Sequence, residues 1–116
     1  MTQPKNDQHQ RDDAVRRVVS LLAAAEYEAI AGLSPAGRLN ATDLSDAVAG
    51  YGRTLLPLPS HAVIDYVTIE GTSALAWSVR VPLHTREEGR SDLTLDLTIR
   101  QQGTRYLVEL DDLHVL

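Results

Sequence analysis

Charged side chains fall at alternate positions between apolar residues in the C-terminal part of the chain. Arg80, Asp96 and Glu109 occupy such positions, and Asp111 and Asp112 follow closely. If these segments are β-strands, alternate side chains share one face of a sheet. A mixed-charge face with an excess of carboxylates can bind a basic protein, or a second copy of the chain, by electrostatic complementarity. We therefore predict a partner-binding surface at these five residues; the simpler interpretation is a solvated sheet face.

A second possible site uses two tyrosines, an aspartate and a tryptophan. Tyr27, Tyr51, Asp65 and Trp77 would line a ligand pocket between the sheet and the helices if all four pointed inward. A desolvated Asp65 would have a raised pKa and could then act as a general base. The simpler interpretation is that Asp65 points to solvent and that the tyrosines pack with their hydroxyls at the surface.

Four potential metal ligands gather near one predicted hairpin. His84, Glu87, Glu88 and Asp92 offer imidazole and carboxylate donors for a divalent cation. No two of them have a spacing that fixes both on one side of a helix, so we predict a solvated turn and no metal site. His114, between apolar neighbours, is expected on the polar face in a structural role.

Composition excludes several functional classes. The chain has 116 residues, no cysteine and a formal charge of −5, which argues against disulfides, thiolate chemistry and binding to nucleic-acid phosphates. The sequence contains no phosphate-binding glycine loop, serine nucleophile elbow or helical His-Glu motif. No motif therefore supports an enzymatic function, and no cofactor is expected. No apolar run reaches membrane-spanning length, and we expect a cytoplasmic protein that binds no membrane.

The segments 75–84 and 92–100 both have apolar residues at odd positions, which predicts two half-buried strands. A three-residue loop, Glu87-Glu88-Gly89, would join them as an antiparallel hairpin. This register has paired residues that share a face, and the predicted pairs are Val79 with Leu97, Val81 with Leu95, Leu83 with Leu93, Arg80 with Asp96, and His84 with Asp92.

A further strand begins at Tyr106, and its apolar residues have the opposite parity. The preceding loop must therefore have an even number of residues, and a turn at Gln102-Gly103 would place Ile99 by Tyr106 and Leu97 by Val108. This register would place Asp96 between Arg80 and Glu109. The alternation slips at Asp111-Asp112, which predicts a β-bulge.

The segment 61–70 is rich in β-branched residues, but its alternation is imperfect. If the odd positions face the core, Asp65 is buried; if the even positions do, Val67 and Ile69 face solvent. We predict an edge strand there, followed by a turn at 71–73. Residues 53–60, with Pro57 and Pro59, form an extended linker into it.

Helical periodicity covers residues 12–33, where apolar residues recur at spacings of three and four. A bend near Glu26 or Tyr27 is possible, and residues 34–37 end the helix. A second helix follows Asn40 as N-cap, with Asp43 as its capping-box partner, and closes at Gly50 or Gly52. Residues 1–10 are predicted to be a disordered tail, and residues 11–116 a single domain.

The predicted fold is α+β, with two N-terminal helices packed on one face of a four-stranded antiparallel meander. This order, with the sequence Leu22-Ala23-Ala24-Ala25-Glu26-Tyr27-Glu28-Ala29-Ile30, resembles the cystatin-like superfamily of nuclear-transport-factor-like and ketosteroid-isomerase-like domains. That resemblance implies a curved sheet wrapped around the helices, and an aspartate base if the protein is an isomerase. The segments 51–55, 89–95 and 111–116 also resemble a family of small uncharacterised bacterial proteins, which implies no function. We predict a non-catalytic accessory or immunity-type module acting by protein contacts; the alternative is a small-ligand binder or isomerase-like enzyme.

Overall fold

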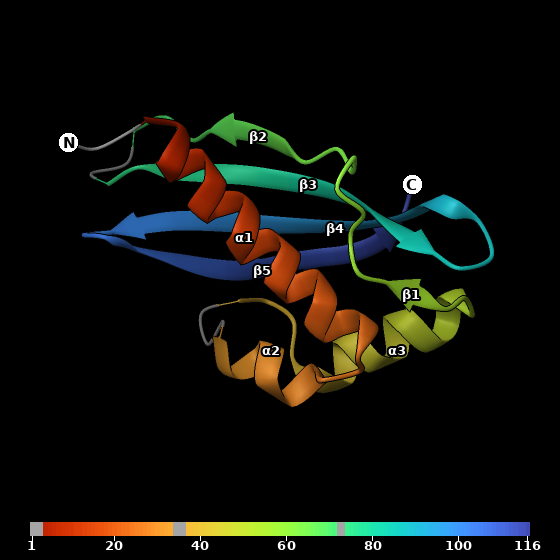
Figure 1. Ribbon diagram of the computed structural model, residues 1–116. Helices are drawn as coiled ribbons and strands as arrows, with labels where there is room; N and C mark the ends of the chain where they lie inside the picture. The colour runs from red at the N-terminus through yellow and green to blue at the C-terminus, as the bar shows by residue number, and fades with distance from the viewer. Residues whose placement is uncertain (1–3, 34–36, 72–73) are drawn as a thin grey trace.

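The computed structural model describes residues 4–33, 37–71 and 74–116 (Figure 1). Three helices precede an antiparallel sheet, which confirms the α+β class. The elements are α1 (Pro4–Ala23), α2 (Tyr27–Leu33), α3 (Ala41–Tyr51), β1 (Leu55–Leu56), β2 (Asp65–Thr68), β3 (Ala76–Thr85), β4 (Gly89–Gln102) and β5 (Arg105–Val115).

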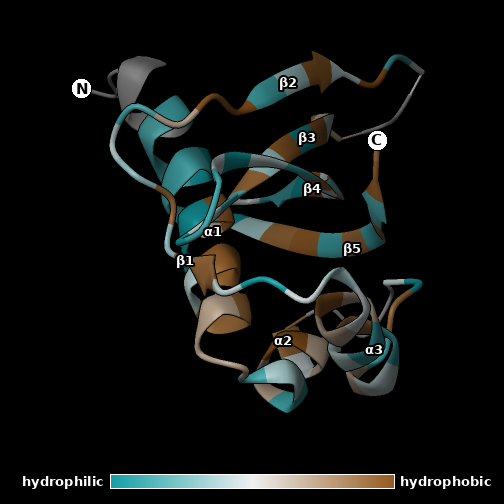
Figure 2. Ribbon diagram, turned by 90° about the vertical axis from the view of Figure 1, so that its right-hand side faces the viewer, coloured by the Kyte–Doolittle hydropathy of each residue, from teal (hydrophilic) through white to brown (hydrophobic). Residues whose placement is uncertain are grey.

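The sheet is a meander of β2, β3, β4 and β5, and the short β1 adds to the same edge of β3 as β2 does. Helix α1 lies across one face of the sheet, and α2 and α3 lie side by side below β5 in the view of Figure 1. In Figure 2 the three helices lie on the left and below, and the opposite face of the strands is turned to the right. We call the helix-covered face the inner face and the opposite one the outer face.

The predicted first helix is divided in two. Ala25 has a left-handed backbone with φ 59°, and two hydrogen bonds, Glu26 N–H to Leu21 C=O and Ala25 N–H to Leu22 C=O, end α1 there in the pattern of a Schellman motif. This break turns Ile30 into the core and leaves Ala29 exposed. An unbroken helix over 12–33 would have placed Ala29 on the same apolar stripe as Leu22.

The two ends of this helical region also differ from prediction. Helix α1 begins at Pro4, so residues 4–10 of the predicted tail are helical. The predicted stop at Ser34-Pro35-Ala36 lies outside the described residues.

Helix α3 begins and ends as predicted. The Asn40 side chain accepts from the Asp43 N–H at 2.8 Å, and the Asp43 carboxylate accepts from the Asn40 N–H at 3.1 Å, which completes a capping box. Gly52 ends the helix with φ 74°, and its N–H donates to the Val48 carbonyl. Glycine is favoured at this position because it has no Cβ and so adopts the left-handed conformation without a steric clash.

The β3–β4 pairing follows the prediction as far as Pro82. Val79 pairs with Leu97, Arg80 with Asp96, and Val81 with Leu95. Beyond Pro82 the register shifts, and His84 pairs with Arg90. The loop is 86–88, one residue earlier than predicted, because Thr85 pairs with Gly89, which has a left-handed backbone with φ 72°. The predicted pairs Leu83–Leu93 and His84–Asp92 are therefore wrong. The Ser91 hydroxyl donates to the Leu83 carbonyl at 2.8 Å, which satisfies a backbone group at this irregularity.

The β4–β5 turn lies one residue later than predicted, at Gly103-Thr104, because Gln102 pairs with Arg105. Gly103 has φ 64° and occupies the first central position, as in a type II′ turn. Ile99 therefore pairs with Val108, and Leu97 with Leu110. The predicted pairs of Ile99 with Tyr106 and Leu97 with Val108 are wrong by two positions, but the faces are unchanged because both turns have even length.

The register also shifts between Asp96 and Leu97, where Asp111 is the extra residue opposite them. This confirms the predicted bulge at Asp111-Asp112. Strand β2 is confirmed as an edge strand, and its parity is now clear: Tyr66 is half-buried, while Asp65 and Val67 are exposed.

Strands β1 and β2 pair with β3 on either side of Pro82, whose nitrogen has no hydrogen to donate. Residues 57–64 leave the sheet between these two pairings. The predicted linker 53–60 thus contains β1 and then a loop outside the sheet.

The core lies between the helices and the inner face. Its members are the odd-numbered apolar residues of β3 and β4 with the buried stripe of α1, and they include Val15, Val18, Val19, Leu22, Val79, Val81, Leu83, Leu93, Leu95, Leu97 and Ile99. This confirms the prediction that the odd residues face the helices. Burial of aliphatic side chains at roughly 25 cal/mol per Å² is the main force that holds the two layers together.

Candidate functional site

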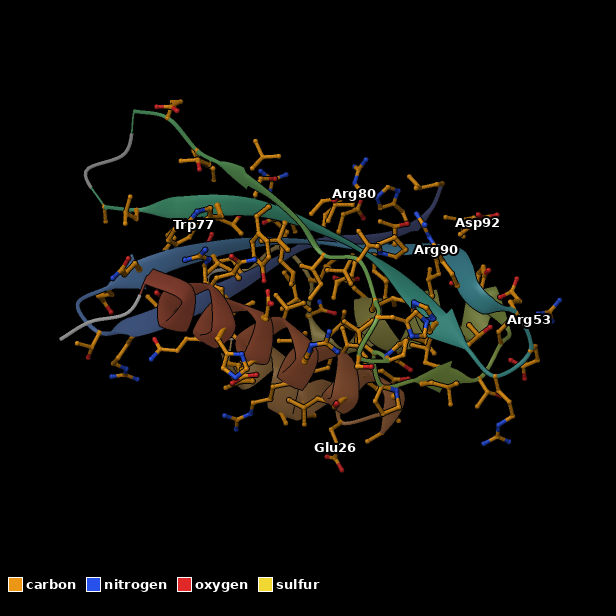
Figure 3. All side chains as sticks on the ribbon, turned by 45° about the horizontal axis from the view of Figure 1, so that its top comes forward. Glu26, Arg53, Trp77, Arg80, Arg90 and Asp92 are labelled. Carbon is orange, nitrogen blue, oxygen red and sulfur yellow. The ribbon has the colours of Figure 1, made fainter. Side chains whose placement is uncertain are left out.

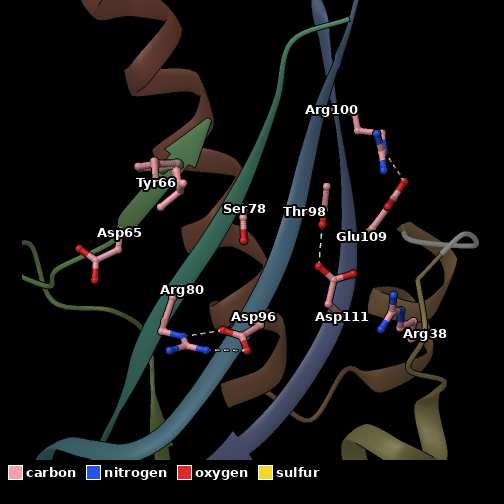
Figure 4. A pocket seen from close by; sticks show the side chains of 11 residues that line it. Arg38, Asp65, Tyr66, Ser78, Arg80, Asp96, Thr98, Arg100, Glu109 and Asp111 are labelled. Carbon is pink, nitrogen blue, oxygen red and sulfur yellow. Dashed lines mark hydrogen bonds and ion pairs between the residues drawn. The ribbon is translucent and has the colours of Figure 1, made fainter. Parts of the chain in front are cut away.

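A hollow of about 870 Å³ crosses the outer face of the sheet (Figure 4). Strands β2, β3, β4 and β5 each contribute to it, and Arg38 reaches its rim from the segment before α3. The lining consists of Arg38, Asp65, Tyr66, Val67, Ser78, Arg80, Asp96, Thr98, Arg100, Glu109 and Asp111. Four of the five residues predicted to bind a partner are in this lining, and the fifth, Asp112, pairs with Asp96.

Asp96 is the most connected side chain of this surface. Arg80 Nε donates to Asp96 Oδ1 at 3.0 Å, and His114 Nε2 lies 2.9 Å from Asp96 Oδ2. Partial burial raises the pKa of Asp96, but the hydrogen bonds with Arg80 and His114 outweigh this effect, and the pKa lies below its ordinary value. Asp96 is therefore a carboxylate held ionised by a partner on each side.

The predicted position of Asp96 between Arg80 and Glu109 is wrong on one side. The shift of two in the β4–β5 register and the bulge at Asp111 place Asp112 and His114 next to Asp96 instead. His114 lies on the polar face as predicted, since it pairs with Thr94 and contacts Asp96.

Asp96, Asp112 and His114 are the described residues that offer a set of metal ligands, with donor atoms within 4.8 Å of one another. The His114 Nε2 to Asp112 Oδ2 distance is 3.9 Å. Two carboxylates and an imidazole suit a borderline divalent cation. Arg80 already donates to Asp96, so a cation there would compete with a guanidinium for the same oxygens.

A second group of polar contacts lies beside the first. Arg100 Nε donates to Glu109 Oε2 at 3.0 Å, and the Thr98 hydroxyl donates to Asp111 Oδ2 at 2.6 Å. Both contacts join β4 to β5. Together with the Arg80–Asp96 pair they fix the side chains of neighbouring strands in one orientation, so the outer face presents an ordered pattern of charge.

The four potential metal ligands considered near the hairpin tip are separated. Glu87 accepts from the backbone N–H and the hydroxyl of Thr54, both at 2.8 Å, and these bonds, the backbone one first, lower the pKa of Glu87. Glu88 accepts from the Tyr51 hydroxyl at 2.9 Å. His84 instead lies against His61, with ring centroids 6.0 Å apart. The two glutamates tie the hairpin to Tyr51 of α3 and to Thr54, which precedes β1.

The four residues of the alternative pocket lie in four different surroundings. Asp65 lines the outer hollow, Tyr51 contacts Glu88, and Tyr27 lines a shallow depression between α2 and α3. Trp77 is buried in the core with the Arg11 guanidinium 4.2 Å from its ring centroid. The structure does not bring these side chains together.

Several residues of the outer hollow were missed by the sequence prediction. Arg38 and Asp65 lie far from β4 in the chain, and only the fold places them at the rim. Thr98 and Arg100 lie at even positions of the same predicted strand as Asp96, which places them on the polar face, but they were not predicted as site residues. Correct placement of the turn at Gly103 would have paired Glu109 with Thr98 and made Arg100 its diagonal neighbour, because that turn fixes the pairing of β4 with β5.

The outer hollow lies within a recognised domain. A family model described as a domain of unknown function (DUF7668) matches residues 19–116. The chain belongs to this family. The match includes every element from α2 to β5, and so every residue of the outer hollow belongs to the family domain. No curated protein and no solved structure matches the chain.

None of the helices in the described part of the chain has the length and apolar character needed to cross a bilayer.

Proposed function

We propose that this protein is a non-catalytic binding module that receives basic side chains of a protein partner in the outer hollow. The observation that supports the proposal is the charge of the lining. Four carboxylates and three guanidinium groups surround the hollow, and Asp112 adds a further carboxylate beside Asp96. A partner of complementary charge gains both specificity and rate of association from such a surface.

The internal contacts leave part of this charge available. Arg80 is paired with Asp96, and Arg100 with Glu109. Asp65 is exposed on β2, and Asp112 keeps more than half of its side chain exposed, at 57%. Lysine or arginine side chains of a partner would meet these two carboxylates without breaking either ion pair.

Two further proposals accompany this one. The order of elements, helices first and then an antiparallel sheet, supports the cystatin-like relationship, which stays a prediction. The absence of cysteine means that the fold needs no disulfides, which is compatible with the proposed cytoplasmic location.

The experiment measures binding of a short, fluorescently labelled peptide rich in lysine and arginine, with an acidic peptide of equal length as reference. We expect the basic peptide to bind in low salt, to weaken as salt is added, and to shift the amide NMR signals of β4 and β5 on the outer face. Asp96→Arg with Glu109→Lys should weaken binding at least about tenfold.

The control is Glu26→Arg with Glu28→Lys, which changes the net charge by the same amount. Both residues are exposed, and Glu26 points away from the sheet at the opposite end of the view from Arg80 (Figure 3). The control should keep binding within about twofold of the wild type. Equal weakening in both variants would show attraction to the whole acidic protein and would overturn the proposal.

Asp96→Arg also removes the contacts to Arg80 and His114, so a second test variant leaves Asp96 in place. Asp65→Lys with Asp112→Lys changes two exposed side chains and should weaken binding while the thermal unfolding curve stays near that of the wild type. Retained binding in this folded variant would contradict the proposed position of the partner.

A further inference from the structure

A second hollow, of about 450 Å³, lies where β3 turns into β4. Its walls are the loop 57–63 on one side and the ends of β1, β3 and β4 on the other. It shares no lining residue with the outer hollow. Its volume falls within the range of about 300–1,000 Å³ found for small-molecule sites.

Most of this lining is apolar, and its ionisable groups are all nitrogen bases. Leu56, Pro57, Pro59, Ala62 and Val63 form apolar walls. The ionisable side chains are His61, His84 and Arg90, and no carboxylate belongs to the lining formed by the described residues. In a chain with 16 acidic residues against 11 lysines and arginines, such a lining is a local reversal of charge.

The three bases lie close to one another. The rings of His61 and His84 meet edge to face, with centroids 6.0 Å apart, and Arg90 pairs with His84 across the two strands. Burial lowers the pKa of His84, and the neighbouring His61 and Arg90 lower it further. An anion placed among these groups would offset the repulsion that His61 and Arg90 exert on a protonated His84.

The loop wall is held in place before any ligand arrives. Arg16 of α1 donates to the carbonyls of Leu58, Pro59 and Ser60, at 3.2, 3.0 and 3.4 Å. The Ala62 N–H donates to the Pro59 carbonyl at 3.0 Å. Two prolines further restrict the loop. A preformed wall lowers the entropic cost of binding.

We infer that this hollow, with His61, His84 and Arg90 at its polar end, is a binding site for a small monocarboxylate with an apolar body. The carboxylate lies among the three bases, and Arg90 donates to it as a guanidinium fork does. The aliphatic or aromatic body covers Leu56, Pro57 and Val63. The site is independent of the partner surface proposed above.

The experiment follows NMR signals of the full chain during titration with hexanoate, with hexanamide as the uncharged analogue of equal size. We expect saturable binding of hexanoate in about the millimolar range or tighter, with shifts at the loop 57–63 and at His84. Hexanoate should raise the pKa of His84, measured from its imidazole signals, because a bound anion stabilises the imidazolium. Hexanamide should bind at least about tenfold more weakly.

Two variants and one control test the position. Arg90→Gln should weaken the binding of hexanoate at least about fivefold. Val63→Asp places a carboxylate in the wall at a side chain that is 52% exposed, so it should repel hexanoate without affecting the fold. Arg53→Gln removes an exposed arginine that does not line the hollow; Figure 3 labels it apart from Arg90. This variant should leave hexanoate affinity unchanged.

Three results would overturn the inference. One is no saturable binding of hexanoate, octanoate or benzoate by the folded wild type. Another is equal affinity for hexanamide, which would show that the bases take no part. The third is equal weakening by Arg53→Gln and Arg90→Gln, or retained affinity in Val63→Asp, either of which would place the anion elsewhere.

Discussion

The two faces of β3 and β4 are built from alternate residues of the same strands and yet differ in polarity and, over most of their length, in burial. On the inner face Val79, Val81 and Leu95 are fully buried beneath the helices. On the outer face Ser78 and Arg80 are exposed, and the charged residues form ion pairs across strands. The inner face holds the layers together, so its residues are fixed by packing. The outer face contributes little to that packing, and its residues are therefore free to serve recognition.

The largest effect should come from the inner face. Leu95→Ala would leave a cavity beneath α1 and should lower the free energy of unfolding by about 2–5 kcal/mol. Ser78→Ala on the outer face should change it by less than about 0.5 kcal/mol. Urea unfolding of the two variants measures the difference. Similar losses of unfolding free energy in the two variants would show that the outer face contributes to stability as much as the inner face does.

A smaller effect is expected at Asp96, the best-connected residue of the outer face. Asp96→Asn should lower the free energy of unfolding by about 1 kcal/mol near neutral pH, because it weakens charge-assisted hydrogen bonds to Arg80 and His114.

The sign of the pH dependence follows from the lowered pKa of Asp96. Its contribution is present above the unfolded-state pKa of about 3.9 and is lost as the pH falls through the lower folded-state pKa. The stability difference between wild type and Asp96→Asn should therefore shrink below about pH 4. A difference that does not change with pH would show that the ionised form of Asp96 carries no stabilisation.

The smallest effect concerns His84, whose pKa is lowered from 6.5. The folded state then binds fewer protons than the unfolded state just below that pH, so stability falls as the pH drops through about 6.5 and below. His84→Gln should lose less stability than the wild type between about pH 7 and 5. Chemical unfolding at a series of pH values tests this, with His9→Gln, at an exposed position in the N-terminal part of α1, as the control. Equal pH dependence in wild type and His84→Gln would show that His84 is not perturbed.

Much of the fold followed from local patterns. The odd-residue alternation of β3 and β4 predicted the buried face, and the Asn40–Asp43 spacing predicted the start of α3. The glycine turns and the Asp111-Asp112 bulge were located to within a residue. These features depend on neighbours in the chain, so the sequence contains their cause directly.

The candidate sites were predicted less well. Alternation placed Arg80, Asp96 and Glu109 on one face, but the partner of Asp96 on β5 was wrong because two turns of even length keep the same faces and differ in pairing by two positions. The contact of Asp96 with His114 therefore appeared only in the structure. Likewise, nothing local indicated that Arg16 of α1 would hold the loop after β1.

By itself, then, the sequence determined the class of fold, the face of each central strand and the acidic character of the protein. The tertiary structure decided which charges meet, where the chain breaks between α1 and α2, and where the two hollows lie. The physical reason is the range of the interactions. Periodicity and caps act over a few residues, whereas strand register, loop docking and the separation of Tyr27, Tyr51, Asp65 and Trp77 depend on contacts between segments that are distant in the chain.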